Sequence, residues 1–340
     1  MSDLVEVIER CYSLEGGRDE WLRGVMEAAV PLTPFAAQLA GMVFEVRDGI
    51  AEIAQIRTFA LDDFGGAEGV REFTRPKDPA QSRRLFTAGP VVAFASKVEG
   101  HPAFANEVYA SALARSGVTD LVGVRAISEP GRGVVLSFPL GLGRSLGVRE
   151  VATWQRIAAH VGTGLRLLDR MQPEAPEPEA ILSPSGKVEH AEADAKSNAA
   201  REDLARATRA IDRARGTLRR VDPQEALALW RCLVDGTWTL VDTFESDGRR
   251  YVVAHRNERP AFLSGSALGA ELTDRELDVL ARLADGHGNK LIAYELGLSL
   301  STVATLLKRA AAKLGANSRA ELVYLARTRG TRRRQGSSSK

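Results

Sequence analysis

The chain has 340 residues, which is enough for two or three domains with separate hydrophobic cores. It contains no apolar run of about 18 residues and no charged start followed by an apolar run, so we expect a cytoplasmic protein without a membrane span. The formal net charge of +2 hides a division, because residues 272–340 hold 13 Lys and Arg against 6 Asp and Glu (net +7), and the remainder holds 33 against 38 (net −5). This segregation favours a basic nucleic-acid-binding module at one end, although a solvated basic surface would give the same count.

The residue types that carry out catalysis or bind metals do not show the spacing of a catalytic or metal site. Cys11 and Cys232 lack CxxC or Cys/His spacing, which favours two buried thiols over a disulfide or a redox switch. The five histidines lack metal-ligand spacing, and no nucleophile elbow or phosphate-binding loop is visible. We therefore expect no metal, no cofactor and no enzymatic activity. An enzyme with an appended regulatory module would instead need convergent titratable groups in a cleft within residues 1–260.

Residues 1–171 are expected to form a domain that mixes helices with antiparallel strands. The predicted elements are amphipathic helices over 4–11 and 20–29, strands over 41–46, 51–59, 121–127 and 133–139, helical and loop segments over 67–116, and a long helix over 148–171. An Asp48-Gly49 pair joins the first two strands and a Pro130-Gly131 turn joins the next two, which indicates two hairpins. Helices bracketing such a sheet resemble a GAF-type sensory domain in the order of elements alone.

A glycine-rich loop over residues 141–147 follows a strand and precedes a helix, as a dinucleotide-binding loop does. The helix leads into a proline-rich segment rather than another parallel strand, so we interpret the loop as an ordinary connection.

Residues 172–179 are expected to be an extended linker, and residues 180–258 a small α+β domain. Its predicted elements are hairpins over 180–191 and 238–255 and helices over 196–220 and 223–234. This order resembles a reduced PAS-like module. Alternatively, Leu204, Ile211 and Leu218 recur every seven residues, which would place one stripe on a coiled coil.

A second linker over 259–267 precedes a four-helix unit over 268–330, and residues 331–340 are expected to be a disordered basic tail. In the first helix of this unit, Thr273 and Glu276 have the spacing of a capping box. Asn289 is expected to cap the second helix. The chain is thus predicted to be a multidomain α+β protein with an all-α C-terminal domain.

The third helix of this unit is expected to begin after a Ser299 cap, following the short Gly297-Leu298-Ser299 connection. Its core-facing stripe is predicted to be Val303, Leu307, Ala310 and Leu314. Two short helices joined by a Gly-containing turn, with small polar and basic residues outward on the second, indicate a helix-turn-helix unit. The fourth helix, over 318–328, is expected to expose Leu322 and Leu325 for a dimer contact.

This segment resembles the C-terminal DNA-binding domain of the LuxR family of bacterial transcription regulators. The matching residues are Leu272, Thr273, Arg275, Glu276, Val279, Leu280, Gly286, Asn289, Lys290, Ile292, Ala293, Leu296, Ser299, Thr302, Val303, Lys313, Leu314 and Arg319. The resemblance covers the last fifth of the chain. The sequence departs from the family at Ala304, where Lys or Arg is usual, and at Leu306, where His is frequent, so one base or phosphate contact is expected to be missing.

The resemblance implies a homodimeric transcription regulator that inserts the 301–314 helix into the major groove of double-stranded DNA. Thr305 and Lys308 are the predicted base-edge contacts, and Ala304 could touch a thymine methyl group. The predicted phosphate contacts are Lys290, Ser301, Thr302, Arg309 and Lys313. The upstream domains would control dimer geometry or access by binding an unknown small-molecule or protein effector.

Two alternatives stay open. A protein-interaction adaptor that has lost DNA binding would also fit Ala304, Leu306 and the alanine run 310–312. An acyl-homoserine-lactone receptor of the same family would also place an α/β sensor before this domain, and Asp78-Pro79 matches part of the pocket signature of such receptors. The flanking Trp and Tyr residues of that signature are absent, and Phe73 and Phe86 are their nearest substitutes.

Overall fold

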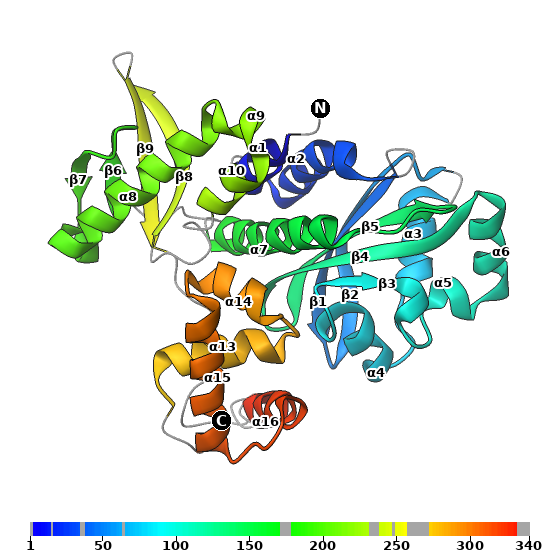
Figure 1. Ribbon diagram of the computed structural model, residues 1–340. Coiled ribbons are helices and arrows are strands. Elements are labelled where there is room, and N and C mark those ends of the chain that lie inside the picture. Colours follow the sequence, from blue (N-terminus) through cyan, green and yellow to red (C-terminus); the bar gives the residue numbers. More distant parts are fainter. Residues whose placement is uncertain are drawn as a thin grey trace. The chain divides into compact units, whose positions relative to one another are not determined.

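The computed structural model (Figure 1) describes residues 3–14, 16–34, 38–62, 65–170, 178–230, 238–246, 249–256 and 272–331. At residues 241–246, 249 and 327–331 it describes the backbone alone. Internal contacts divide the chain into two compact units. The first unit comprises residues 1–87 and 91–257 and contains both β-sheets. The second comprises residues 88–90 and 258–340 and contains the C-terminal helices. The predicted linkers lie almost entirely outside the described residues.

The larger sheet of the first unit has five antiparallel strands in the order β2-β1-β5-β4-β3. The strands are β1 (Leu39–Arg47), β2 (Ile50–Phe59), β3 (Val92–Phe94), β4 (Val118–Glu129) and β5 (Arg132–Gly141). Asp48 and Gly49 both have positive φ, 51° and 81°, which matches the tight two-residue turn that the Asp-Gly pair predicts. β1 pairs with β2 and β4 pairs with β5, both antiparallel, so the two hairpins predicted within residues 1–171 are confirmed. The short strand β3 was not predicted, because three residues carry too little alternation.

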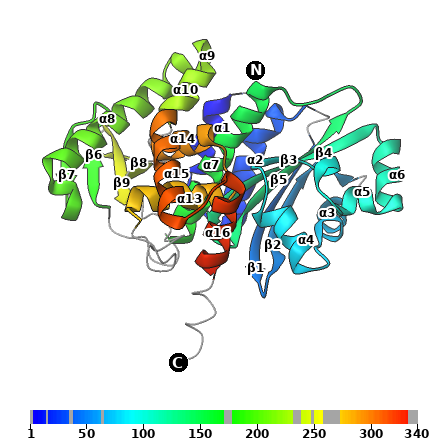
Figure 2. The same ribbon diagram turned by 60° about the horizontal axis from the view of Figure 1, so that its bottom comes forward.

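Helices cover both faces of this sheet (Figures 1 and 2). On one face lie α2 (Arg18–Ala29) and α7 (Val148–Arg170), with α1 (Leu4–Cys11) packed against both. On the other lie α3 (Gly66–Thr74), α4 (Pro79–Ser82), α5 (Pro102–Ala105) and α6 (Glu107–Arg115). Short helical turns occupy Val30–Leu32, Arg83–Thr87 and Ala95–Lys97. Helix α7 packs closely on the sheet because Gly162 has no side chain; a Cβ there would lie 2.5 Å from the carbonyl oxygen of Ile127.

The glycine-rich loop over 141–147 connects β5 to α7. Because β5 is antiparallel to both β1 and β4, the parallel β-α-β arrangement of a dinucleotide site is absent from this described part of the sheet. The loop is an ordinary connection, as predicted.

The smaller sheet has the order β7-β6-β9-β8. Its strands are β6 (Ala180–Leu182), β7 (Val188–Ala191), β8 (Trp238–Ser246) and β9 (Arg249–Arg256), and its helices are α8 (Asn198–Arg215), α9 (Leu218–Val221), α10 (Pro223–Leu229) and the turn Ala193–Lys196. The coiled-coil alternative is wrong. Helix α8 ends before Leu218, its residues Leu204 and Ile211 are buried within the chain, and α8 packs against α10, β7 and β8 of the same module.

Within the first unit, α1 contacts the helices of this smaller module. The Arg215 side chain donates to Glu9 at 2.8 Å and lies 5.1 Å from the centre of the Trp230 ring. Tyr12 stacks on the same indole, with ring centroids 6.4 Å apart. A charge pair and a stacked aromatic group therefore connect the two modules, and their division into separate domains stays a prediction.

Cys11 is buried, and burial raises the pKa of its thiol, as expected for an inert core cysteine. Cys232 lies outside the described residues. Among the helices that the structure describes, no single one is long and apolar enough to cross a membrane; the bent pair α14 and α15 passes by length and composition alone.

The second unit consists of α13 (Asp274–Ala284), α14 (Asn289–Leu296), α15 (Leu300–Leu314) and α16 (Arg319–Thr331), close to the four predicted helices. Its core is formed by Val279, Leu280, Leu283, Ile292, Ala293, Leu296, Val303, Leu307, Leu314, Leu322 and Ala326. The predicted core-facing stripe of the third helix is confirmed.

Candidate nucleic-acid interface and ligand cavity

The start of α13 is fixed by the predicted capping box. Thr273 accepts a hydrogen bond from the Glu276 backbone, and the Glu276 carboxylate accepts one from the Thr273 backbone at 2.8 Å. The same carboxylate oxygen accepts a hydrogen bond from Lys313 Nζ at 2.7 Å. Burial disfavours the charged form of Glu276, but the hydrogen bonds from Lys313 and Thr273 outweigh it and lower its pKa. Glu276 therefore links the first and third helices of the unit.

A second buried carboxylate, Glu295, links the loop after α13 to α14. It lies 2.8 Å from His287 Nδ1 and 3.2 Å from Arg282 Nε. Burial opposes charge on the imidazole, but the Glu295 carboxylate outweighs burial and raises the His287 pKa. The Arg319 guanidinium donates to Asn289 Oδ1 at 2.8 Å, which connects α16 to α14. The prediction that Asn289 caps α14 is wrong, because Gly288 is the N-cap and the Asn289 side chain accepts from Arg319 instead.

Helices α14 and α15 form the predicted helix-turn-helix. The chain bends by 105° between them, within the 90–120° range of this motif. Gly297 closes α14 in the left-handed conformation with φ 60°, where a glycine avoids the cost of a Cβ. The hydroxyl of Ser299 then caps α15 by accepting from the Thr302 backbone at 3.0 Å. Both ends of the turn are thus set by local sequence.

The outward face of α15 carries the predicted DNA-contacting side chains, all exposed: Ser301, Thr302, Ala304, Thr305, Lys308, Arg309 and Lys313. The hydroxyls near its start are engaged within the turn, since Ser299 Oγ lies 2.7 Å from Ser301 Oγ and 2.8 Å from Thr302 Oγ1. The Thr305 hydroxyl donates to the Ser301 carbonyl at 2.9 Å. It must rotate before it can donate to a base, although its oxygen can already accept.

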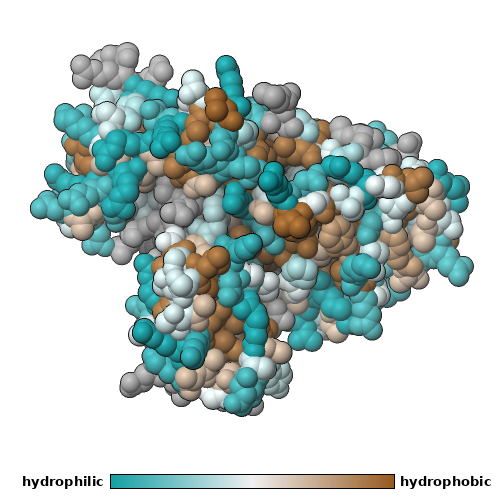
Figure 3. All heavy atoms as spheres, viewed as in Figure 1, coloured by the Kyte–Doolittle hydropathy of each residue, from teal (hydrophilic) through white to brown (hydrophobic). Residues whose placement is uncertain are grey.

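The basic residues of this face differ in what they contact. Among the described residues Lys290, Lys308 and Arg309 are exposed and have no ion-pair partner, whereas Lys313 pairs with the buried Glu276. Leu300 is also exposed, and Figure 3 shows hydrophilic and hydrophobic side chains next to one another on the second unit. Of the four cations among the predicted DNA contacts, three are therefore available to DNA, and Lys313 is not.

The expectation that Leu322 is exposed is wrong. Its side chain is 3% exposed and belongs to the core of the second unit, and Leu325 packs partly against the same core. The spacing alone could not show this, because α13 and α15 both pack against α16 and cover that side of the helix. The large apolar side chain that α16 exposes within its described part is Tyr324.

Comparison with known proteins agrees with this geometry. Residues 270–326 match the family of bacterial regulatory proteins of the luxR type. Residues 270–326 form a LuxR-type helix-turn-helix domain. The LuxR-type segment is 45% identical over 60 residues to the transcriptional regulatory protein YdfI of Bacillus subtilis, covering 18% of this chain and 28% of that protein. It is 47% identical over 57 residues to the HTH-type transcriptional activator RamA of Corynebacterium glutamicum, covering 17% of this chain and 20% of RamA.

The chain thus spans less than a third of either curated relative, and each match covers less than a fifth of this chain. Among solved structures, the Escherichia coli protein SdiA aligns over 93% of this chain and 92% of its own at 11% identity, with a TM-score of 0.33. A score that low does not establish a common fold for the remaining residues.

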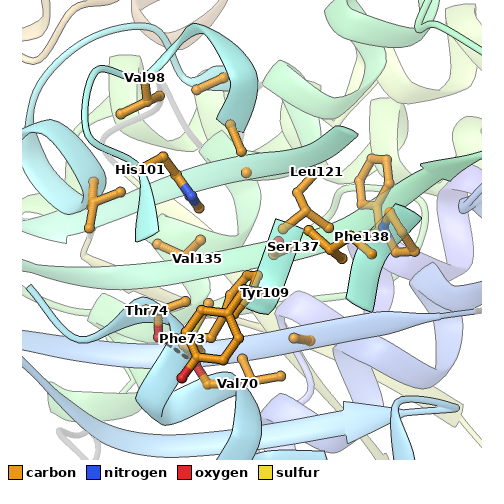
Figure 4. A pocket seen from close by; sticks show the side chains of 18 of the residues that line it. Val70, Phe73, Thr74, Val98, His101, Tyr109, Leu121, Val135, Ser137 and Phe138 are labelled. Atoms are coloured by element: carbon orange, nitrogen blue, oxygen red, sulfur yellow. Dashed lines mark hydrogen bonds between the residues drawn. The ribbon is translucent and has the colours of Figure 1, made fainter. Parts of the chain in front are cut away.

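The first unit contains a cavity of about 340 Å³ between its larger sheet, helices α3 and α6, and the helical turn Arg83–Thr87. Figure 4 shows Val70, Phe73 and Tyr109 from helices facing Leu121 and Val135 from strands across this space. The Asp78 side chain caps α4, accepting from the Gln81 backbone at 2.7 Å, and does not line the cavity. The cavity therefore does not use the Asp78-Pro79 pair that the lactone-receptor alternative required.

The cavity exists because one row of the sheet holds only small side chains. In register across four strands lie Ala93, Gly123, Ser137 and Ala40, and all four line the cavity. The adjacent row holds Met42, Val135 and Arg125. Sequence reasoning missed this site, because each small residue is unremarkable until the strand register brings all four together.

Proposed function

We propose that this protein is a sequence-specific, DNA-binding transcription regulator whose LuxR-type domain inserts α15 into the major groove. The observation that supports this most is that α15 has two different faces. It buries Val303, Leu307 and Leu314, and its opposite face exposes small polar and basic side chains. The helix lies at 105° to α14, as in a helix-turn-helix. The identity to transcriptional regulators over this segment supports the same assignment.

Within this proposal the residues of α15 divide by chemistry. Lys308 lies one turn after Thr305 on the exposed face, where both can reach base edges, and Ala304 can contact a thymine methyl group. Arg309 and Lys290 approach phosphates, together with the hydroxyls of Ser301 and Thr302. We omit Lys313 from the DNA contacts, because its ammonium group pairs with Glu276.

The regulator acts as a homodimer on a two-fold-related site, and α16 contributes to that contact through its exposed face around Tyr324 rather than through Leu322. The first unit is the sensory part, with a GAF-like larger sheet and a PAS-like smaller one. Its cavity supports a small-molecule effector over a protein effector, since 340 Å³ falls within the range of ligand pockets and the lining is mostly apolar.

The test is capture of genomic fragments by the full-length protein, followed by sequencing and by titration of the recovered site. A shared, two-fold-symmetric sequence among captured fragments supports the proposal. Recovery of random fragments, or no saturable binding at low salt, would favour an adaptor role.

A further inference from the structure

The polar groups that line the cavity of the first unit include positively charged side chains but no carboxylates among the described residues, and this difference indicates which ligands it binds. Of its 25 lining residues, 19 are apolar or glycine, and the polar ones are Thr74, Arg84, His101, Tyr109, Arg125 and Ser137. Two of the six are arginines. None of the described lining residues is an aspartate or a glutamate. The charged side chains of the lining are therefore cationic, which favours an anionic ligand over a cationic one.

His101, another residue of the cavity lining, adds a hydrogen-bond donor. Burial lowers the pKa of His101 to about 4, against the opposing effect of the Asp120 carboxylate, so its ring is neutral near pH 7. Its Nδ1 accepts a hydrogen bond from the Ala103 backbone at 3.2 Å. A neutral imidazole that accepts at Nδ1 carries its hydrogen on Nε2, which makes Nε2 a donor. Figure 4 shows the His101 ring turned toward the cavity.

We propose that the cavity binds a small apolar carboxylic acid as its anion, with the hydrocarbon body over the row Ala93, Gly123, Ser137 and Ala40. The arginine side chains of the lining receive the carboxylate, because an ionised acceptor bonded to a guanidinium forms stronger and shorter hydrogen bonds than a neutral one. Arg125 lies in the row next to the small residues, through its pairing with Val135. This ligand class deepens the proposed sensory function and rests on it.

Matched probes measure this preference directly. Octanoate, octanol and octylamine share one apolar chain and differ in the charge of the head group, and each is titrated calorimetrically into the full-length protein. We expect saturable binding of octanoate at one molecule per chain, roughly ten-fold weaker binding of octanol, and no measurable binding of octylamine.

Two variants locate the binding. A Cβ at Gly123 would meet no atom within 4 Å, so Gly123→Leu extends into the cavity without displacing the sheet, and it should abolish binding of octanoate and octanol alike. Arg84→Met removes one of the two lining guanidinium groups, so it should weaken octanoate binding and leave octanol binding unchanged. Arg83→Met is the matched control, since Arg83 is an exposed neighbour outside the lining, and it should change neither.

The possible failures are distinguishable. Equal binding of octanol and octanoate, or tighter binding of octylamine, would overturn the acid class and leave a ligand-binding sensory cavity in place. Absence of binding by every probe, or unchanged octanoate binding in Gly123→Leu, would overturn both the acid class and the sensory role of the cavity. Neither outcome affects DNA binding by the second unit, which is measured separately.

Discussion

Replacing Lys313 by Met distinguishes a structural role for this residue from a role in DNA binding. The change keeps the aliphatic stem and removes the ammonium group that donates to Glu276, a side chain that is 2% exposed. A hydrogen bond between charged groups is worth about 1.5–3 kcal/mol. Because the Lys313 side chain is 38% exposed, solvent screens part of this interaction, and we take the lower end, about 1.5 kcal/mol.

For a helical unit of this size, a loss of about 1 kcal/mol lowers the melting temperature by roughly 4–8 °C, so Lys313→Met should lower that of the second unit by roughly 6–12 °C. Hydrogen exchange of peptides from residues 272–326, followed with temperature in the full-length protein, reports this unit separately. The pKa of Glu276 is lowered in the folded state, so its contribution is present above the unfolded value of about 4.3 and is lost as pH falls through the folded pKa. Lys313→Met should flatten that acid limb.

The control is Lys308→Met, which changes an exposed lysine of the same helix and should alter stability by less than about 0.5 kcal/mol. A structural role for Lys313 would be refuted if Lys313→Met left stability unchanged and instead reduced the salt dependence of DNA binding, since that is the behaviour of a phosphate contact.

Three further substitutions test other parts of the structure. His287→Gln should flatten the fall in stability at alkaline pH. The pKa of His287 is raised beside Glu295, so its contribution to stability is full below the unfolded pKa of about 6.5 and is lost as pH rises through the folded pKa. If denaturant unfolding at several pH values shows the same dependence of stability on pH in the variant and the wild type, this prediction is wrong. Gly315→Ala should lower the free energy of unfolding by about 1 kcal/mol in the same assay, because Gly315 ends α15 with φ 72°, in the left-handed region. A Cβ there would meet no neighbour, so no clash adds to this cost. An unchanged free energy of unfolding would show that the left-handed conformation carries no cost here. Tyr12→Phe removes a buried hydroxyl that lies 2.8 Å from His160 Nδ1, so it should destabilise the first unit by about 1–3 kcal/mol. A melting temperature equal to that of the wild type would mean that this hydrogen bond makes no net contribution to stability.

The second unit was largely predictable because its boundaries depend on local chemistry. The capping box of Thr273 and Glu276, the left-handed Gly297 and the Ser299 cap each act within four residues, so a sequence shows them directly. The errors concern longer distances. The partner of Lys313 lies 37 residues away, and the burial of Leu322 depends on how α13 and α15 pack against α16.

The first unit was predictable only in part. Alternating hydrophobicity and turn residues located both hairpins of the larger sheet, but strand order and register depend on pairings across the whole unit. The cavity follows from that register, because Gly123 and Ser137 become neighbours only when β4 pairs with β5. Similarly, the heptad spacing of Leu204 and Ile211 could not distinguish a coiled coil from a helix packed on its own sheet.

The central claim, that α15 binds DNA in the major groove, is tested most directly by titrating a recovered genomic site and a random duplex with wild-type protein and with Lys308→Ala over a range of salt concentrations. The two cations proposed to contact phosphates, Lys290 and Arg309, amount to four per dimer. They predict that the logarithm of the wild-type association constant falls with the logarithm of salt concentration with a slope of about −3.6. Lys308→Ala should weaken binding to the specific site by roughly 1–3 kcal/mol and affect the random duplex much less. Equal loss on both duplexes would show that Lys308 contacts no base, and no salt-dependent, saturable binding by the wild-type protein would contradict the account.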